Sequence, residues 1–356
     1  MSSRNPKHDH AGLSRRGVLG AGSLLAATAP ALAMLPGQPA TARPPGDGPT
    51  APIPPNAVGP SIPASGYLYE EIGDNLFWLT DGLYQMMFLV TDEGVLAVDA
   101  PPTLGNNILR AIRKVTRKSV KHAVYSHAHA DHVGAMVLYE DAELWSHAAV
   151  ARSLRVANDP NRPVPERART FRRSQEIQLG GERLRLDYRG PNHAPGNLFV
   201  YAPRQRVLML VDVIFPGWVP FAYLAVSSNI PGWITAHEKA LDYPFTTLVG
   251  GHLTRLGTRD DVRTQQAYIT ELRSRAEYEL THVDLGAILE TIDATNPWAV
   301  FEAYLDAVAT QTAEYIEPRW ITRLGGADVF TNENAWTMAE SLRLDYGLLD
   351  PFGIHP

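Results

Sequence analysis

The sequence predicts an α/β protein with a functional site at the carboxyl ends of buried strands, and two observations lead to this prediction. Short apolar segments typical of buried strands recur along the chain, and three of them are followed within a few residues by a histidine or an aspartate. Beyond residue 260 the apolar residues take helical spacing, as in Trp298, Phe301, Leu305 and Val308. Strand ends are where sheets carry binding and catalytic residues.

Residues 1–33 have the features of an export signal. Arg15 and Arg16 precede a weakly apolar stretch that ends in the small residues of Ala31-Leu32-Ala33. The arginine pair resembles the twin-arginine signal, which exports proteins that have already folded. A membrane anchor is the alternative, but the apolar run is short and rich in alanine and glycine. We therefore expect cleavage near Ala33 and a periplasmic or secreted protein.

The charge of the mature chain argues against two classes of partner. Removing residues 1–33 takes away four basic residues and one acidic residue, so that 28 basic and 37 acidic residues remain, a net charge of about −9. This balance argues against nucleic acid and offers no basic surface for stable membrane association after signal cleavage. The chain has no cysteine, so a packed core must stabilise it without disulfides.

Residues 34–65 are predicted to form a linker. Ten of the 28 prolines lie within residues 36–63, with almost no apolar periodicity. Such a segment buries too little apolar surface to fold, so we expect it to be extended and mobile. Order resumes at Tyr67, and residues 77–80 and 86–90 are predicted to be the strands that open the folded domain.

Residues 126–134, of sequence SHAHADHVG, place four metal-ligating side chains within six positions. They come directly after a predicted buried strand. Extended backbone puts alternate side chains on one face, so His127, His129 and Asp131 are expected on one side. His132 breaks this alternation, and the four residues after it are expected to open a helix. Imidazole and carboxylate are the ligands of zinc and, to a lesser degree, of iron or manganese.

Three further residues of the ligand type follow predicted strands. His193 lies in a Gly/Pro/Asn turn after an alternating apolar segment, Asp212 ends a continuous apolar run, and His252 follows a strand and a pair of glycines. For each of them taken alone, a structural polar role is the alternative. Together with the first motif they predict one metal site.

The order His-x-His-x-Asp-His, followed by His193, Asp212 and His252, resembles the metallo-β-lactamase superfamily over residues 66–260. The resemblance implies a four-layer αββα sandwich with a dinuclear metal centre at one edge between its two sheets. Residues 261–356 exceed what this sandwich needs and are predicted to form a C-terminal helical extension. Carried over by position, the ligands are His127, His129 and His193 for the first metal and Asp131, His132 and His252 for the second, with Asp212 bridging both. Asp99 matches a position that supports the site without binding a metal.

The residue at position 212 divides the superfamily. One subclass of true β-lactamases uses a cysteine near this place, whereas an aspartate resembles the glyoxalase II, lactonase and arylsulfatase-like branches. An alternative register, shifted by one residue, would remove Asp212 from the metals and bring the chain closer to another β-lactamase subclass.

The resemblance implies an exported dinuclear zinc hydrolase that acts on a small molecule, namely a lactone, ester, thioester or amide. Two divalent ions lower the pKa of a shared water and make hydroxide available, and Asp131 is expected to orient this nucleophile and pass its proton to the leaving group. The alternatives are iron or manganese in place of zinc, a mononuclear iron dioxygenase of the persulfide type, a true β-lactamase, and a non-catalytic metal-binding protein.

Two segments are candidates for shaping the substrate site. The loop after Asp212 is rich in aromatic residues and proline, and Trp218, Phe221 and Tyr223 are expected either to line an apolar substrate pocket or to pack against the C-terminal segment or a partner subunit. The arginine-rich residues 152–173 are either a lid for an anionic substrate or, as we expect, a solvated helical face.

Two other histidines are not expected to bind metal. His147 is predicted to be a structural residue at a strand–helix junction, and His237 a helix-surface residue. For the C-terminal helices three roles are alternatives: they cover the site, they pack on the domain, or they form a homodimer.

Overall fold

The computed structural model describes residues 50–349 and 351–352. The predicted signal peptide and residues 34–49 of the predicted linker lie outside these residues, so both stay predictions. Within the described part of the chain, no helix has the length and apolar character needed to cross a membrane.

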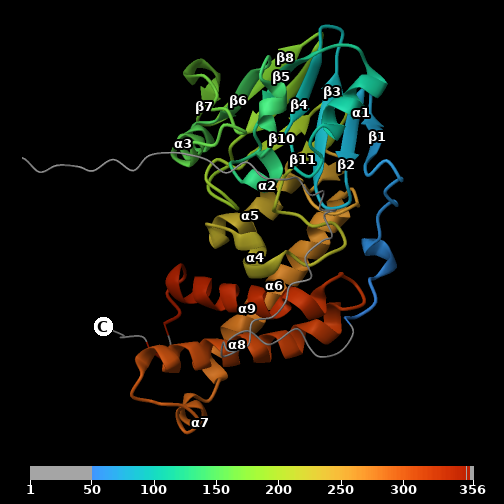
Figure 1. The fold of residues 1–356 in the computed structure, drawn as a ribbon. Coiled ribbons are helices and arrows are strands. Elements are labelled where there is room, and N and C mark those ends of the chain that lie inside the picture. Colours follow the sequence, from blue (N-terminus) through green and yellow to red (C-terminus); the bar gives the residue numbers. More distant parts are fainter. Residues whose placement is uncertain (1–49, 350, 353–356) are drawn as a thin grey trace, which may run out of the picture. The chain divides into compact units, whose positions relative to one another are not determined.

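The described strands form two sheets (Figure 1). The first sheet has its seven strands in chain order; the first four are antiparallel, and β4 to β7 run parallel. They are β1 Leu68–Gly73, β2 Leu76–Thr80, β3 Gln85–Val90, β4 Val95–Val98, β5 Val120–Val124, β6 Glu143–His147 and β7 Thr170–Phe171. The strands predicted at residues 77–80 and 86–90 are confirmed as β2 and β3.

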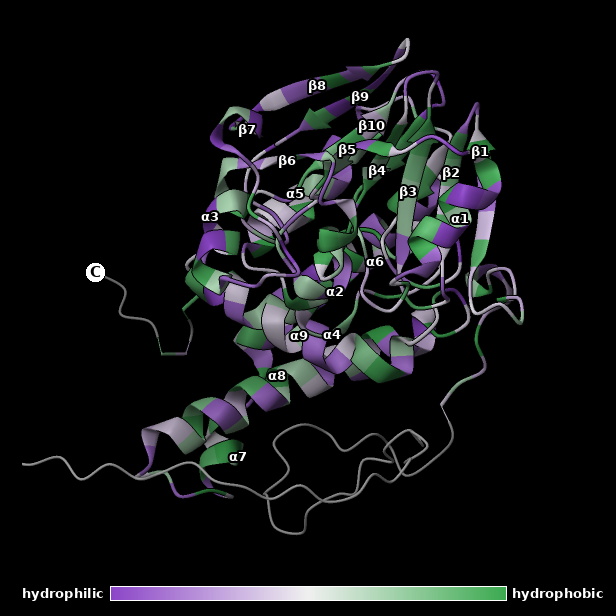
Figure 2. Ribbon diagram, turned by 45° about the horizontal axis from the view of Figure 1, so that its top comes forward, coloured by the Kyte–Doolittle hydropathy of each residue, from purple (hydrophilic) through white to green (hydrophobic). Residues whose placement is uncertain are grey.

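The second sheet has five strands in the order β12-β11-β10-β9-β8. Its neighbours are antiparallel except for β11 and β12, which run parallel. The strands are β8 Ser174–Leu179, β9 Glu182–Asp187, β10 Phe199–Ala202, β11 Val207–Met209 and β12 Thr247–Val249. Figure 2 shows β3 and β4 in the colours of hydrophobic residues, and the edge strand β8 largely in those of hydrophilic ones.

Helices cover the outer faces of both sheets and make up the C-terminal region. They are α1 Asn107–Val115, α2 Ala130–Val133, α3 Ala148–Ala157, α4 Ala222–Val226, α5 Ile230–Leu241, α6 Arg259–His282, α7 Leu285–Leu289, α8 Pro297–Trp320 and α9 Ala327–Leu344. The 3-10 helices are η1 Pro55–Ala57, η2 Met136–Tyr139 and η3 Arg167–Arg169.

Three buried apolar clusters separate the layers. Trp78 of the first sheet and Met209 of the second belong to the cluster between the sheets. Phe88, on the other face of the first sheet, belongs to the cluster formed with α1 and α3. Leu208 of the second sheet belongs to the cluster formed with α5, α6, α8 and α9. These clusters confirm the predicted four-layer αββα sandwich with a C-terminal helical region.

The C-terminal helices share their core with the sandwich. Leu272 of α6 and Met338 of α9 lie in the same buried cluster as Trp233 of α5. Because one apolar cluster continues across the predicted boundary at residue 260, burial in the helical region stabilises the sandwich as well. The predicted domain boundaries themselves stay a prediction.

Gln265 of α6 ties this helical region to the segment that follows β11. Its Oε1 accepts a hydrogen bond from the N–H of Phe215 at 2.8 Å, and its Nε2 donates to the carbonyl of Val213 at 2.6 Å. The Gln265 side chain is buried, so losing it would leave two buried backbone groups without partners. The helical region thereby fixes the chain just beyond Asp212.

The expectation that His237 is a helix-surface residue is wrong. Its side chain is buried, lies edge-on to the ring of Trp233 at a centroid distance of 4.8 Å, and has its Nε2 2.8 Å from Nε2 of Gln265. Burial lowers the pKa of His237 to about 4. By contrast His147 ends β6 and caps α3, its Nδ1 accepting a hydrogen bond from the N–H of Ala149, which confirms its structural role.

Residues 50–65 do not fit the expectation of an extended, mobile linker. Ala57 is buried, and its carbonyl accepts a hydrogen bond from Nε1 of Trp218 at 3.0 Å. The N–H of Ala51 donates to the carboxylate of Asp328 at 2.7 Å. Prolines restrict the backbone before it docks, which lowers the entropy lost on ordering. These residues therefore pack on the loop after β11 and on α9.

The arginine-rich residues 152–173 run through α3, η3 and β7. Arg152 and Arg155 of α3 are exposed, as expected of a solvated helical face, but Arg162 is not: it lies beyond α3, its side chain is 14% exposed, and it donates to the carbonyl of Ala128 at 2.9 Å.

Candidate metal centre

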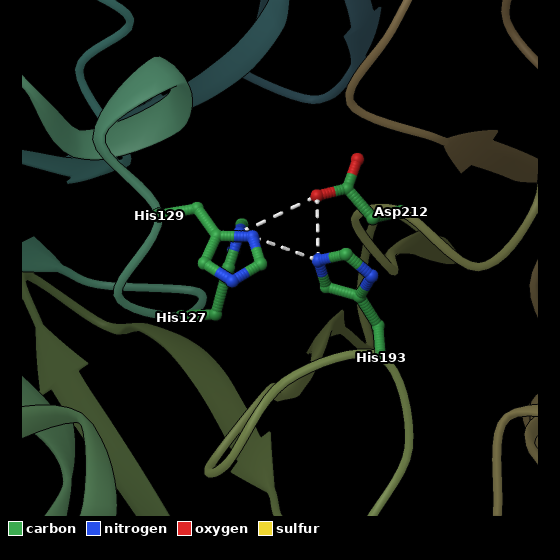
Figure 3. A group of neighbouring side chains, drawn as sticks. All are labelled: His127, His129, His193 and Asp212. Carbon is green, nitrogen blue, oxygen red and sulfur yellow. Dashed lines mark hydrogen bonds and ion pairs between the residues drawn. The ribbon is translucent and has the colours of Figure 1, made fainter. Parts of the chain in front are cut away.

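The first ligand candidates follow β5 in the parallel part of the first sheet. The N–H of Ser126 donates to Oδ1 of the buried Asp99 at 2.8 Å, which fixes the start of the loop. The hydroxyl of Ser126 lies 2.9 Å from Nδ1 of His127. This contact orients the His127 ring so that its Nε2 faces the carboxylate of Asp212, as Figure 3 shows. Asp99 thus supports the site from behind.

The loop turns into helix three residues before the predicted start at Val133. Helix α2 begins at Ala130, with His129 in extended conformation at its N-cap. Asp131 therefore lies in the first helical turn, where an acidic side chain is favoured, and not on extended backbone. The prediction that Asp131 shares a face with His127 and His129 is wrong, as is a helix beginning at Val133.

His193 is held by two buried asparagines of its turn. The side-chain oxygen of Asn192 accepts a hydrogen bond from the N–H of His193 at 2.7 Å and another from Nδ2 of Asn197 at 2.9 Å. Nδ2 of Asn197 also donates to the carbonyl of Val211, at 3.0 Å. Because Val211 precedes Asp212, these amides couple the turn to the strand end that carries the aspartate.

Asp212 projects from a left-handed backbone conformation. Its φ is 62°, which aspartate tolerates better than most residues. The N–H of Asp212 donates to the carbonyl of Gly250 at 3.2 Å, and its own carbonyl accepts a hydrogen bond from Nε1 of Trp233 at 3.0 Å. Main-chain contacts on both sides therefore fix the origin of the carboxylate.

His252 depends on the glycine before it. Gly251 has a φ of 95°, and a Cβ at this position would lie 2.7 Å from Cγ1 of Val211 and 3.2 Å from Cε1 of His132. Glycine is the residue that fits both the backbone conformation and the space. Nε2 of Gln85 donates to the carbonyl of His252 at 2.9 Å. This bond joins the segment after β12 of the second sheet to β3 of the first.

The structure brings the seven predicted side chains into two adjoining groups. The members of the first group are His127, His129, His193 and Asp212, and those of the second are Asp131, His132 and His252. Within each group the potential ligand atoms lie within 4.8 Å of one another.

The carboxylate of Asp212 is divided between the two groups. Its Oδ2 lies 3.4 Å from Nε2 of His127 and 3.1 Å from Nε2 of His193. Its Oδ1 lies 3.2 Å from Nε2 of His132 and 2.8 Å from Nε2 of His252. Figure 3 shows one oxygen facing the first group while the other points away from it. These distances exclude the alternative register in which Asp212 leaves the site.

The donor set fits two metal ions. Nδ1 of His129 lies 3.0 Å from Nε2 of His193, and Nε2 of His132 lies 3.1 Å from Nε2 of His252. Two imidazole nitrogens this close require a shared proton or a cation between them. The buried Nε2 of His127 makes no hydrogen bond within the described residues. Nitrogen and oxygen donors of this kind suit zinc, iron and manganese alike.

The electrostatics of the groups favour a cation. Burial lowers the pKa of His127 and of His129, so both rings offer free lone pairs. Burial alone would raise the pKa of Asp212. The surrounding histidines, of which His132 contributes most, outweigh this effect and hold the pKa of Asp212 well below its usual range. Burial likewise opposes the charge on His132, yet Asp212 raises its pKa to about 9. A divalent ion would take the place of that proton.

Both groups reach the surface, and His129 of the first group is exposed. The side chain of Asp131 is 42% exposed and that of His252 25%, whereas His127 and His132 are fully buried. Tyr84, from the turn between β2 and β3, covers the second group: its ring lies 5.4 Å from that of His132 and 5.0 Å from that of His252. Solvent therefore reaches His129 of the first group as well as Asp131 and His252 of the second.

A left-handed turn beside His193 was not predicted. Four consecutive non-glycine residues of α4, namely Tyr223, Leu224, Ala225 and Val226, have φ between 51° and 61°. Such backbone costs roughly 1–2 kcal/mol for each residue. The turn leads directly to Ser227, whose hydroxyl lies 3.4 Å from Nδ1 of His193.

Asn334 of α9 holds this turn in place. Its Oδ1 accepts a hydrogen bond from the N–H of Leu224 at 2.7 Å, and its Nδ2 donates to the carbonyl of Pro220 at 2.9 Å. Asn334 is fully buried, so both bonds are protected from water. No sequence pattern marks it, because it stands inside a helix more than a hundred residues from its partners.

The three predicted pocket residues separate in the structure. Trp218 and Phe221 line an apolar cavity together with His252, and both also contact the C-terminal region, so the packing interpretation is confirmed while the substrate pocket stays a prediction. Tyr223 does not line that cavity but a larger, open one between α8 and α9. The left-handed turn reverses the chain between Phe221 and Ser227, which explains the separation.

Asn334→Ala is expected to weaken metal binding by the first group by about tenfold, because the turn that positions Ser227 on His193 loses its clamp. It should also lower the free energy of unfolding by about 1–3 kcal/mol, since a buried N–H and a buried carbonyl lose their partners. Competition with a chelator and urea unfolding measure the two effects. Asn332→Ala, on the same helix, is the control; equal effects of the two substitutions would contradict this role of Asn334.

Comparisons with known proteins agree with this geometry. Residues 80–252 match the family model of the metallo-beta-lactamase superfamily. The chain is 28% identical over 213 residues to 2,4-dinitroanisole O-demethylase subunit alpha of Nocardioides sp. (strain JS1661). The aligned region covers 56% of this chain and 63% of that protein. The chain is also 25% identical over 236 residues to metallo-beta-lactamase type 2 of Elizabethkingia meningoseptica, and this alignment covers 63% of this chain and 90% of that protein. The chain thus spans just under two thirds of the first relative's length.

Among solved structures, the metallo-beta-lactamase from Pontibacter korlensis aligns with a TM-score of 0.48 and 19% identity, over 56% of this chain and 97% of that one. The family match spans β3 to β12 and every residue of the two candidate groups. This chain therefore carries a domain of the metallo-β-lactamase superfamily, with His and Asp groups that fit a dinuclear metal site.

Proposed function

We propose that the protein is a dinuclear zinc hydrolase that cleaves a lactone, ester, thioester or amide. The observation that carries this proposal is the position of Asp212, whose two carboxylate oxygens each face one group of histidines. A single-metal enzyme has no need of the second group or of a carboxylate shared in this way. An aspartate in place of a cysteine here supports the glyoxalase II and lactonase-like branch.

The residues of the second group suit proton transfer. A pair of bound divalent ions supplies hydroxide and polarises the substrate oxygen. Asp131 has one carboxylate oxygen 3.5 Å from Nε2 of His132, and its side chain is 42% exposed. In this position it accepts the proton of the nucleophile and delivers it to the leaving group.

The metal content tests the dinuclear assignment. The purified chain is expected to retain two zinc ions after dialysis, and His252→Ala one, because His127, His129 and His193 complete a three-nitrogen set for the first ion. Elemental analysis measures both numbers. His282→Ala, which removes an exposed histidine of α6, should keep two. A single tightly bound iron, unchanged in His252→Ala, with oxygen consumption on a persulfide, would instead support the dioxygenase.

A substrate screen tests the reaction class. Zinc-loaded protein is expected to hydrolyse at least one of a lactone, a thioester, an aryl ester and nitrocefin; the name of the first relative adds 2,4-dinitroanisole to the panel. On that substrate Asp131→Asn should lower kcat by about 10²–10⁴-fold, the usual loss of a general acid–base group. Asp141→Asn, at an exposed position ten residues away, is the control. Similar rates for the two variants would remove Asp131 from proton transfer.

We further propose export by the twin-arginine route, on the sequence of residues 1–33 alone. Replacing Arg15 and Arg16 by two lysines is expected to leave folded, metal-loaded precursor in the cytoplasm. Fractionation of cells that express the two forms measures this. Export at the original rate would instead indicate the general secretory route or an anchor.

A further inference from the structure

An apolar cavity of about 190 Å³ adjoins the second group of the candidate metal centre. His252 forms one of its walls, and Nε2 of the same ring lies 2.8 Å from Oδ1 of Asp212. A molecule in the cavity therefore lies one imidazole ring away from the centre. Of the seven candidate ligands His252 alone lines the cavity, so the cavity meets the second group through this ring.

The walls of the cavity are mainly aromatic. Phe215, Trp218 and Phe221 come from the loop after Asp212, and Phe330 comes from α9. The ring of Phe215 stacks on that of His252 at a centroid distance of 5.8 Å, and Phe221 meets Phe330 edge-on at 5.0 Å. Ring faces and edges of this kind prefer an aromatic guest.

The size and chemistry of the cavity limit what it can take. An apolar cavity of about 150 Å³ is enough to hold benzene, whereas drug-sized ligands need about 300 Å³ or more. His252 is the only ionisable side chain among the described lining residues, so a charged group would enter without a partner. One uncharged ring matches both limits.

The base of the cavity is firmly held. The N–H of Gly325 donates to the carbonyl of Gly217 at 2.9 Å, and the N–H of Val219 donates to the carbonyl of Gly325 at 3.1 Å. A Cβ on Gly325 would lie 2.6 Å from the ring of Trp218, so this glycine permits the indole to pack against the chain. The cavity is thus preformed by the junction of the post-Asp212 loop with the C-terminal region.

From these observations we infer that the cavity is a substrate subsite for one uncharged aromatic ring of a molecule whose reacting group lies at the metal centre beyond His252. The inference rests on the proposed hydrolase function for its reaction, and it names the substrate class as aryl compounds. Val329 and Phe330 of α9 become specificity-determining residues, although they lie outside the residues that match the superfamily.

A binding experiment tests the subsite without any turnover. Crystals of the zinc-loaded protein soaked in iodobenzene are expected to show the iodine between Trp218 and Phe330, and ¹⁹F NMR titration gives the Kd of fluorobenzene in solution. Val329→Trp, which fills the cavity, should weaken that Kd at least tenfold. Val156→Trp, at an exposed valine of α3, should leave it within twofold. Phe330→Ala, which removes a wall of the cavity, should also weaken the binding of fluorobenzene. This second variant keeps the test valid if the new indole of Val329→Trp points to solvent.

Iodine found only outside the cavity, or a Kd unchanged in both Val329→Trp and Phe330→Ala, would overturn the inference. A second measurement tests the ring subsite separately from the proposed hydrolase function. The ratio of kcat/KM for phenyl acetate to that for methyl acetate should fall at least tenfold in Val329→Trp but not in Val156→Trp. Fluorobenzene binding without hydrolysis of any substrate would refute the hydrolase and leave the ring site standing; hydrolysis with an unchanged ratio would refute the ring site alone.

Discussion

The site depends on one buried carboxylate held between two sets of imidazoles. Asp212 is almost fully buried, and each of its oxygens faces two histidine nitrogens. A buried anion is costly unless it is neutralised, so the position is stable only with positive charge on both sides. Protons can supply that charge in part, as the raised pKa of His132 indicates, and two divalent ions supply it fully. The chain around Asp212 is arranged to hold the carboxylate in this position.

That arrangement extends well beyond the sandwich. Trp233 of α5 binds the carbonyl of Asp212, Gln265 of α6 binds the two residues on either side of Ile214, and Asn334 of α9 clamps the turn that leads to Ser227. Each of these contacts is buried, and each comes from a helix that the second sheet's apolar cluster holds in place. The C-terminal region therefore takes part in building the site, and its amides act where water would otherwise compete.

The resemblance to the superfamily implied the fold, and the sequence singled out the residues that meet at the site because these follow strand ends. The position of a strand end depends on a local apolar pattern, and parallel strands bring their carboxyl ends to one edge. The sequence was not sufficient where contacts join distant segments. Asn334 lies 110 residues from Leu224, and the left-handed turn has no glycine to announce it. The proline-rich residues 50–65 resembled a free linker because their packing partners, Trp218 and Asp328, come much later in the chain.

The most direct test of the account is anomalous diffraction at the zinc edge on crystals of the zinc-loaded protein. If the Asp212 carboxylate is shared, two zinc peaks lie about 3.5–4 Å apart, one on the side of His127, His129 and His193 and the other on the side of His132 and His252, with one aspartate oxygen directed at each. A single peak among the first three histidines, with the second group empty at saturating zinc, would contradict the account.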